Sequence, residues 1–219
     1  MPMRVAVLAS GRGSNLQALI DARAAGRLDV ELVAVFSDRA GAVALERARA
    51  AGIHAQSLAP KSFATRAAFD AALFAAVAAV QPQLIVCAGY MRIIDDAVVA
   101  AHAGRMINIH PSLLPRHRGL HTHEAVLAAG ESLHGASVHF VTPELDGGPV
   151  VAQAPMAVLA GDTPATLAQR LLPLEHELLV ATVGLIAAGR VALHGDRVLL
   201  DGAPLAAPLV YSSGQLDAG

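Results

Sequence analysis

The chain has 219 residues, of which 54% are hydrophobic and 16% are charged, and its formal net charge is −2. This length is sufficient for one large domain with a substantial core. The absence of a basic surplus argues against a nucleic-acid partner. The longest apolar runs, AALFAAVAAV and LLVATVGLIAAG, are shorter than the roughly 18 residues that a membrane span requires, so we predict that they form buried helices.

The first residues lead directly into a strand-like VAVLAS, without the apolar segment and cleavage site of a signal peptide. The only cysteine, Cys87 in LIVCAG, cannot form a disulfide within the chain and is predicted to be buried. We therefore expect a cytoplasmic protein that contacts neither nucleic acid nor membrane, as a monomer or a weak homodimer.

In the first half, short runs rich in valine and isoleucine alternate with alanine-rich stretches, which is typical of βαβ units. The predicted strands cover residues 4–10, 31–37, 54–58, 83–88 and 106–110. The helical stretches NLQALIDARAA, AVALERARAA and TRAAFDAALFAAVAAV end at Gly26, at Gly52 and at Gln81–Pro82. The predicted fold class is α/β, with a doubly wound, mostly parallel sheet and helices on both faces.

After residue 133 the pattern predicts β-rich additions. GASVHFVTPELDGGPVVAQAPMAV contains two β-rich runs joined by the turn-prone PELDGGP loop. A helix is predicted from about Thr163 to Ala188, and VALHGDRVLLDG predicts a small edge hairpin. No repeat, low-complexity linker or composition break marks a domain boundary. We expect residues 1–219 to form one domain, with an N-terminal half of about 1–105 and a C-terminal half of about 106–219.

The glycine loop SGRGSNLQALI follows the first predicted strand and opens the first helix, so backbone N–H groups and the helix dipole would converge on an anion. The third glycine of the dinucleotide fingerprint and the Walker lysine are both missing, which favours a monophosphate ester. The alternative is that Gly11 and Gly13 only permit a tight turn. Ser14 and Asn15, which can cap the helix or contact phosphate, favour binding.

The stretch NIHPSLLPRHRGLHTH, residues 108–123, contains four histidines. Asn108 and His110 alternate at the end of a predicted strand, so they share a face at the carboxyl edge, where open α/β sheets bind ligands. His121 and His123 are spaced by two at a helix start and cannot share a helical face, which is poor metal geometry. We therefore expect no metal, and we interpret His117, like that pair, as a surface or capping residue.

The sequence resembles the glycinamide ribonucleotide formyltransferases, a family of folate-dependent formyl enzymes. The resemblance rests on SGRGSNLQALI, VFSDRA, LERARAAGI, AGYMRII, NIHPSLLP, GLHTHEAVL, HGASVHFVTPELDGGPVVAQ and LEHELL. It implies the formyltransferase fold and the transfer of a formyl group from the co-substrate 10-formyltetrahydrofolate to the amine of glycinamide ribonucleotide, in purine biosynthesis. The N-terminal half would bind the nucleotide phosphate, and the C-terminal half would perform catalysis and bind folate.

An amine that attacks a formyl group creates an oxyanion, and an amide from Asn108 and a proton on His110 suit the place where that charge appears. The resemblance adds Asp146, in the ELDGGP loop, as a carboxylate that folds over to His110, keeps the imidazole charged and helps to move the amine proton. It also suggests Ser137 and His139 as supporting residues. Without the resemblance, Asp146 would be interpreted as a turn aspartate.

The resemblance also implies substrate contacts. For the ribonucleotide these are Gly13, Ser14, Asn15, Leu172, Pro173, Leu174 and Glu175, with Glu175 holding the glycinamide amine. For the folate they are Arg66, which reaches the glutamate tail, and Met91, Arg92, Ile93, Ile94, Asn108, Thr142, Pro143, Glu144, Leu145 and Asp146 around the pterin. The Leu114–Pro115 bond would be cis. Pro173 is unusual inside a helical pattern and is expected to remove one helix hydrogen bond and kink the chain before Glu175.

Three other functions share part of this pattern. A formyltetrahydrofolate deformylase shares the N-x-H motif and the aspartate but usually carries a regulatory domain ahead of them. A methionyl-tRNA formyltransferase would need a further domain and a basic face. A non-catalytic nucleotide-binding module would need the glycine loop but not Asn108, His110 or Asp146. The combination of the loop with these three residues favours formyl transfer.

Overall fold

The computed structural model describes residues 1–217, and the chain forms two compact units, Met1–Asn108 (unit 1) and a second that begins at Ile109 (unit 2). The division falls inside a strand and is not marked by any change in composition. Within the described residues, no helix has both the length and the apolar character needed to span a membrane.

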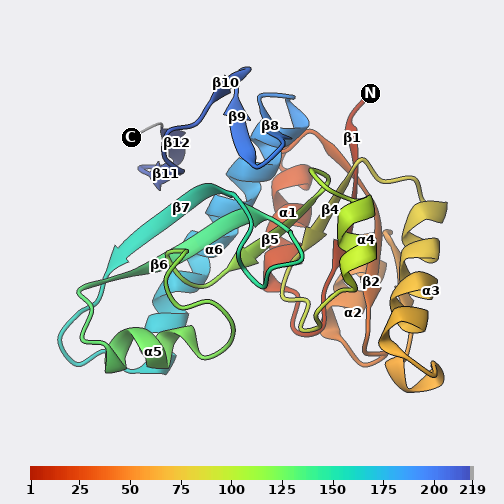
Figure 1. The fold of residues 1–219 in the computed structure, drawn as a ribbon, viewed down its shortest axis with the longest axis horizontal. Helices are drawn as coiled ribbons and strands as arrows, with labels where there is room; N and C mark the ends of the chain where they lie inside the picture. Colours follow the sequence, from red (N-terminus) through yellow and green to blue (C-terminus); the bar gives the residue numbers. More distant parts are fainter. Residues whose placement is uncertain (218–219) are drawn as a thin grey trace. The chain divides into compact units, whose positions relative to one another are not determined.

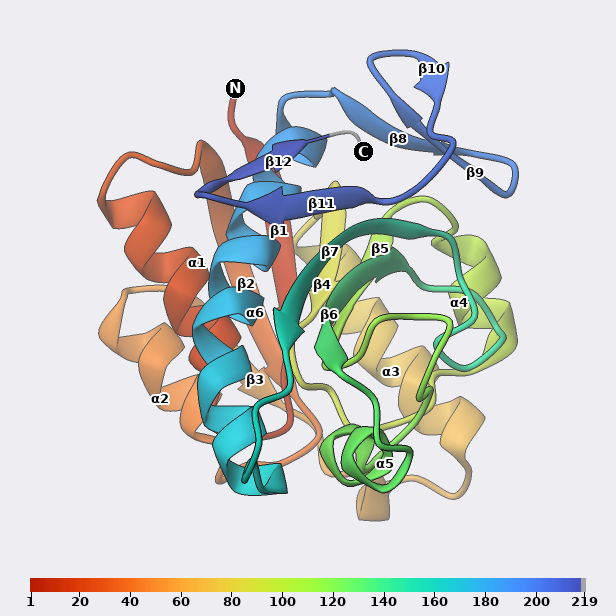
Figure 2. The same ribbon diagram turned by 90° about the vertical axis from the view of Figure 1, so that its left-hand side faces the viewer.

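Unit 1 is a parallel sheet with helices on both faces. Its elements are β1 (Met3–Leu8), α1 (Ser14–Ala24), β2 (Val30–Ser37), α2 (Val43–Ala50), β3 (His54–Ser57), η1 (Pro60–Ser62), α3 (Arg66–Ala79), β4 (Leu84–Cys87), α4 (Asp96–Ala101) and β5 (Met106–His110), which continues into unit 2. The strand order is β3-β2-β1-β4-β5. Helices α1 and α2 cover one face and α3 and α4 cover the other (Figures 1 and 2). The doubly wound prediction is confirmed.

The sequence explains this arrangement locally. Val5 to Leu8 in the central strand β1 are fully buried, and β4 is buried along its whole length, as expected for strands covered on both faces. Gly26 and Gly52 adopt φ 70 directly after α1 and α2, which confirms that these glycines end the helices. Helix α3 begins where the Thr65 hydroxyl accepts a hydrogen bond from the Ala68 amide. Cys87 is buried as predicted, and burial raises the pKa of its thiol to about 12.

Between residues 109 and 217, unit 2 contains two helices and strands of two sheets. Its elements are α5 (Thr122–Ala128), β6 (Leu133–Phe140), β7 (Val150–Ala157), α6 (Pro164–Ala187), β8 (Val191–His194), β9 (Arg197–Leu200), β10 (Ala203–Pro204), β11 (Leu209–Ser212) and β12 (Gln215–Asp217). Strands β6 and β7 are antiparallel, β11 pairs with β7 in parallel, and β12 pairs with β11. Strands β8, β9 and β10 form a separate antiparallel sheet. Helix α6 packs on β6 and β7 (Figure 1).

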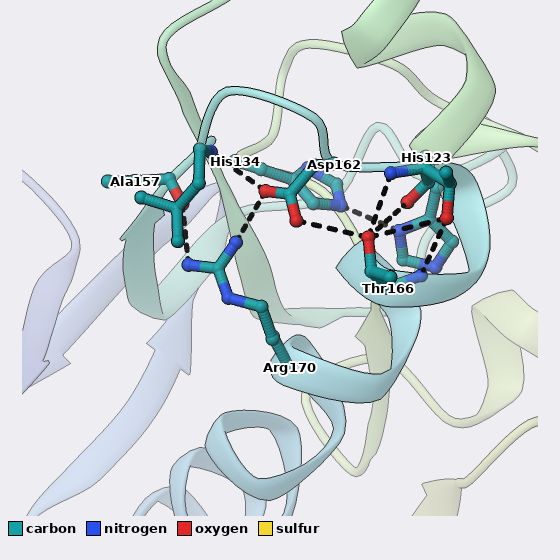
Figure 3. Close-up of polar contacts among 8 residues, drawn as sticks. His123, His134, Ala157, Asp162, Thr166 and Arg170 are labelled. Carbon is teal, nitrogen blue, oxygen red and sulfur yellow. Dashed lines mark hydrogen bonds and ion pairs between the residues drawn. The ribbon is translucent and has the colours of Figure 1, made fainter.

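The long predicted helix is confirmed as α6, with Thr163 at its N-cap and Ala188 at its C-cap. The Thr163 hydroxyl accepts from the Thr166 amide, and the Thr166 hydroxyl accepts from the Thr163 amide. Figure 3 shows the Thr166 hydroxyl and the Arg170 guanidinium donating to the Asp162 carboxylate beside this cap. Pro173 lies inside the helix and does not end it.

The predicted hairpin near the C-terminus is confirmed as β8 and β9, but the sequence did not indicate η1, α4, β10, β11 or β12. Strands β10, β11 and β12 lack the longer continuous apolar runs that marked β1 and β4. Strand β11 is held by pairing with β7, where Leu209 pairs with Ala152, and local patterns do not encode so distant a partner.

Candidate active site

The glycine loop lies at the point where the sheet of unit 1 changes direction. Strands β1 and β4 are neighbours, and the chain leaves them toward opposite edges of the sheet. The two loops that follow are joined, because the Ser10 amide donates to the Gly89 carbonyl at 3.0 Å and the Ser10 hydroxyl accepts from the Met91 amide at 2.9 Å. Open α/β sheets bind ligands at the carboxyl ends of strands at such a switch point.

Gly13 is the N-cap of α1, and no side chain caps this helix end. The suggestion that Ser14 or Asn15 caps the helix is therefore wrong: Ser14 is the first helical residue and Asn15 is buried. Gly13 has φ 70, and a Cβ there would lie 2.7 Å from both Cα and Cβ of Ala44. Only glycine fits, and the helix end presents backbone N–H groups rather than a side chain.

Helix α2 braces this loop. The Ala44 amide donates to the Gly11 carbonyl at 3.1 Å, and the Arg47 guanidinium donates to the Arg12 carbonyl at 2.9 Å. A second nitrogen of Arg47 donates to the Gln17 side chain at 2.9 Å. Sequence reasoning missed Arg47, although LERARAAGI was part of the resemblance.

The folate residues expected in unit 1 have different environments. Met91 and Ile93 are exposed by 59% and 55%, whereas Ile94 is buried. The Arg92 guanidinium carbon lies 5.1 Å from the ring centroid of Phe69, so this side chain packs on unit 1. Arg66 is exposed at the start of α3, and Asn108 is half-buried in β5.

Asp70, which the sequence did not single out, accepts a hydrogen bond from the Asp95 amide at 2.8 Å. Burial raises the pKa of its carboxyl, while this hydrogen bond and the charges of Arg66 and Arg92 lower it. Both arginines thus act on one buried carboxyl group.

In unit 2, two predicted side chains, those of His110 and His139, meet the carboxylate of Asp146. Its Oδ2 lies 3.4 Å from Nδ1 of His110, and its Oδ1 lies 3.6 Å from Nε2 of His139. The side chains of His110, His139 and Asp146 are exposed by only 7%, 2% and 9%. The Gly119 amide donates to Oδ2 at 2.8 Å. Asp146 therefore lies against His110, as expected from the resemblance.

The hydrogen bonds of His110 constrain where its protons lie. Nε2 is 2.9 Å from the carbonyl oxygen of His117, so this nitrogen must carry a proton and donate it. Nδ1 faces the Asp146 carboxylate, and that contact is favourable only when Nδ1 is also protonated. Both contacts are satisfied together only by the imidazolium, whereas the neutral ring keeps its proton on Nε2.

Burial opposes this charged form. It lowers the pKa of His110 below the usual value, and the His117 carbonyl and the Asp146 charge offset only part of the effect. The Asp146 charge acts in the expected direction, because it raises the pKa of His110, but burial has the larger effect. Burial also raises the pKa of Asp146, but hydrogen bonds from His139 and Gly119 and the charges of the two histidines lower it overall. The pKa of each member of the pair therefore lies below its usual value.

Ser137 holds the turn that follows His110. Its hydroxyl donates to the Ser112 carbonyl at 2.7 Å and accepts from the Leu114 amide at 3.0 Å. The Gln153 side chain donates to this hydroxyl and to the Leu114 carbonyl, at 2.9 and 2.8 Å. The Leu114–Pro115 bond is cis, as expected.

The loop from Thr142 to Gly148, which joins β6 and β7, carries Asp146 at φ 47. Pro143, Glu144 and Leu145 are exposed, and the Glu144 carboxylate forms an ion pair with Arg118. A Cβ on Gly148 would lie 1.9 Å from the Phe140 carbonyl oxygen, so the chain passes too closely for any side chain. The ribonucleotide residues Leu172 to Glu175 lie within α6, where Pro173 is exposed and the other three are half-buried.

The four histidines of residues 108–123 have four different partners. His110 meets Asp146, His117 meets Glu131 at 3.0 Å, and His121 lies 3.7 Å from Glu124. Nδ1 of His123 is 2.8 Å from Nε2 of His134 (Figure 3). Among residues 1–217, no three or more His, Cys, Asp or Glu side chains are grouped so that they could hold a metal ion. The His117 side chain was expected to be a surface or capping residue, but it is only 17% exposed and pairs with Glu131, and its backbone carbonyl accepts from His110.

Comparison with known proteins places the chain in a family. The model of a family described as formyl transferase matches residues 3–183. The chain belongs to the formyl transferase family. The phosphoribosylglycinamide formyltransferase of Escherichia coli (strain K12) is 46% identical over 200 residues, which cover 91% of this chain and 94% of that protein.

Solved structures of formyl transferases have the same fold. A phosphoribosylglycinamide formyltransferase from Coxiella burnetii, in complex with CHES, matches with a TM-score of 0.93 and 45% identity and covers 97% of this chain and 100% of that one. A formyltetrahydrofolate deformylase from Burkholderia mallei matches with a TM-score of 0.83 and 27% identity, over 91% of this chain and 70% of that one.

The residues that the sequence missed in this formyl transferase share one property. Glu131, Gly119 and Gln153 act on the predicted residues through backbone groups or through contacts distant in sequence. Arg116 and Arg118 flank His117 in the sequence, and in the structure they form ion pairs with Glu131 and Glu144.

Proposed function

We propose that this chain transfers the formyl group of 10-formyltetrahydrofolate to the amine of glycinamide ribonucleotide, giving N-formylglycinamide ribonucleotide and tetrahydrofolate in purine biosynthesis. The His110–Asp146 pair is the observation that carries this proposal. It is a buried acid–base pair on a chain whose family transfers formyl groups. The glycine loop of unit 1 supplies the N–H groups for the ribonucleotide phosphate.

The reaction requires charge stabilisation and one proton movement. The amine nitrogen bonds to the formyl carbon, the bond from that carbon to N10 of the folate breaks, the amine loses a proton, and N10 gains one. The Asn108 amide and a proton on Nδ1 of His110 stabilise the oxyanion of the tetrahedral intermediate. The Asp146 charge becomes more valuable as His110 takes up positive charge, so the pair favours the transition state over the ground state.

The remaining residues bind and orient the substrates. Gly13, Ser14 and Asn15 hold the phosphate, and Glu175, with Leu172 to Leu174, holds the glycinamide end. Arg66, Met91 to Ile94 and Thr142 to Asp146 contact the folate, while Ser137 and His139 support the His110–Asp146 pair. Arg92 packs on Phe69, so its part is to shape this surface.

Residues 1–219 act as one formyltransferase domain, with phosphate binding in the N-terminal half and catalysis and folate binding in the C-terminal half. We place the protein in the cytoplasm as a monomer or weak homodimer, with the two substrates as its partners and neither nucleic acid nor a membrane involved.

The likeness to a formyltetrahydrofolate deformylase favours one alternative, in which water replaces the amine. An absorbance assay for tetrahydrofolate release distinguishes the two activities. We expect release only when glycinamide ribonucleotide is present. Equal release with water alone would establish the hydrolase and reject the transferase. Activity that a chelator abolishes and zinc restores would contradict the metal-free mechanism.

A further inference from the structure

The segment Arg116–Gly119 supplies the two backbone groups that hold the His110–Asp146 pair. The His117 carbonyl accepts the Nε2 proton of His110, and the Gly119 amide donates to Asp146. His117 adopts φ 51 and Gly119 adopts φ 80, so the segment is a tight, left-handed turn. The geometry of the pair therefore depends on what fixes this turn.

The carboxylate of Glu131 holds the turn Arg116–Gly119 in place. Its Oε1 lies 3.0 Å from Nε2 of His117, and its Oε2 lies 3.0 Å from the Arg116 guanidinium. The carboxylate thus contacts two successive residues of the turn, and its side chain is only 22% exposed. These contacts lower the pKa of the Glu131 carboxyl, with the His117 hydrogen bond as the largest cause.

The end of α5 places Glu131. The Gly130 amide donates to the Leu127 carbonyl at 3.1 Å, and the Glu131 amide donates to the Val126 carbonyl at 3.2 Å. With Gly130 at φ 63, this resembles the glycine-ended helix terminus that directs the next residue sideways. The carboxylate is therefore held by ordered backbone rather than by a flexible loop.

We propose that Glu131 is a positioning residue for His110. By holding His117 and Arg116, it keeps the His117 carbonyl against Nε2 of His110 and so leaves Nδ1 as the nitrogen that exchanges a proton beside Asp146. The kinetic consequence rests on the proposed function. The consequence for the imidazole itself holds whatever reaction the chain performs.

Other charged groups near this chain of contacts must be considered. Asp146, His139 and His134 act on His110, and His134 also lies near Glu131 and His117. Glu131 pairs with the His117 side chain, and the His117 carbonyl accepts from His110, so the position of this carbonyl links Glu131 to His110.

The test is nitrogen-15 NMR of the histidine side chains, with the His110 signals assigned by their loss in His110→Gln. In the wild type, neutral His110 should carry its proton on Nε2. In Glu131→Ala, the Nδ1-protonated form should increase and the pKa of His110 should fall, because the carbonyl that raises it moves away. Glu131→Gln, which keeps the size of the side chain, should shift both in the same direction but less.

Glu124→Ala is the matched control, because Glu124 is an exposed glutamate that also pairs with a histidine of the same stretch. It should leave the His110 signals unchanged. Unchanged His110 signals in Glu131→Ala, or equal shifts in the Glu124 control, would overturn the proposal. If Glu131→Ala does not fold, Glu131→Gln decides alone, and unaltered His110 signals in that variant overturn it.

Kinetics provide a second readout. Glu131→Ala should lower kcat about tenfold, the size of one positioned hydrogen bond, and change KM for either substrate by less than about twofold. A rise in KM with unchanged kcat would contradict a positioning role. If the wild type transfers no formyl group, the proposed function fails while the NMR result still decides the role of Glu131.

Discussion

Replacing Asp146 by asparagine removes the charge beside His110 while preserving the size of the side chain. The carboxylate oxygen lies 3.4 Å from Nδ1 of His110, and both side chains are almost fully buried. At an effective dielectric constant of about 20, two unit charges at this distance attract by about 5 kcal/mol. That is an upper limit for the stabilisation lost when His110 becomes charged, because the amide dipole replaces part of it.

We therefore expect Asp146→Asn to lower kcat by about two to four orders of magnitude, or roughly 3 to 5 kcal/mol, with little change in substrate binding. The Asp146 charge raises the pKa of His110, so its removal should lower that pKa further. Residual activity should then decline at a lower pH than in the wild type as the pH rises.

Steady-state kinetics across pH measure both effects. Asp201→Asn, at an exposed aspartate paired with Arg190, controls for loss of a carboxylate elsewhere. A kcat for Asp146→Asn within about threefold of wild type, with an unchanged pH profile, would remove Asp146 from the mechanism.

Three further variants test other parts of the structure. Gly13→Val should raise KM for the ribonucleotide at least about tenfold, and far more than KM for the folate, because the added side chain would meet Ala44 and displace the phosphate loop; equal rises would indicate general misfolding instead. Burial and nearby charges lower the pKa of His134 to about 4, so the folded state resists its protonation and stability should fall by about 3 kcal/mol as the pH drops from 6.5 to 4. Denaturant titrations should show a shallower fall for His134→Asn, and identical slopes would refute this. Gly148→Ala should destabilise the protein by about 2 kcal/mol or more, because its Cβ would meet the Phe140 carbonyl, whereas Gly147→Ala meets only a flexible glutamate side chain and should cost less in the same titration.

The sequence predicted the elements whose signals are local. The glycines at 26 and 52 mark helix ends by their conformational freedom, and the apolar runs of β1 and β4 reflect burial on both faces. Strand β11 could not be predicted, because its apolar run is short and its pairing with β7 joins residues far apart in the sequence.

For the candidate site, the sequence identified the side chains but not the contacts and burial that determine their pKa values. The proximity of Asp146 to His110 came from a family resemblance, since the two residues are 36 positions apart. The direction of the pKa shift of His110 could not be predicted, because burial is a property of the packed fold. The His117 carbonyl and the Gly119 amide were missed because every residue carries such groups, and only the turn selects these two.

Three non-glycine residues in this part of the chain, His117, His121 and Asp146, have left-handed backbone, with φ of 51, 60 and 47. Each such residue costs roughly 1 to 2 kcal/mol relative to an ordinary conformation. Glycine would relieve that strain but would remove the side chains that meet Glu131, Glu124 and His110. Selection for stability alone would therefore favour glycine at 117 and 146, and the side chains present there indicate that the site has been kept at the expense of some folding free energy.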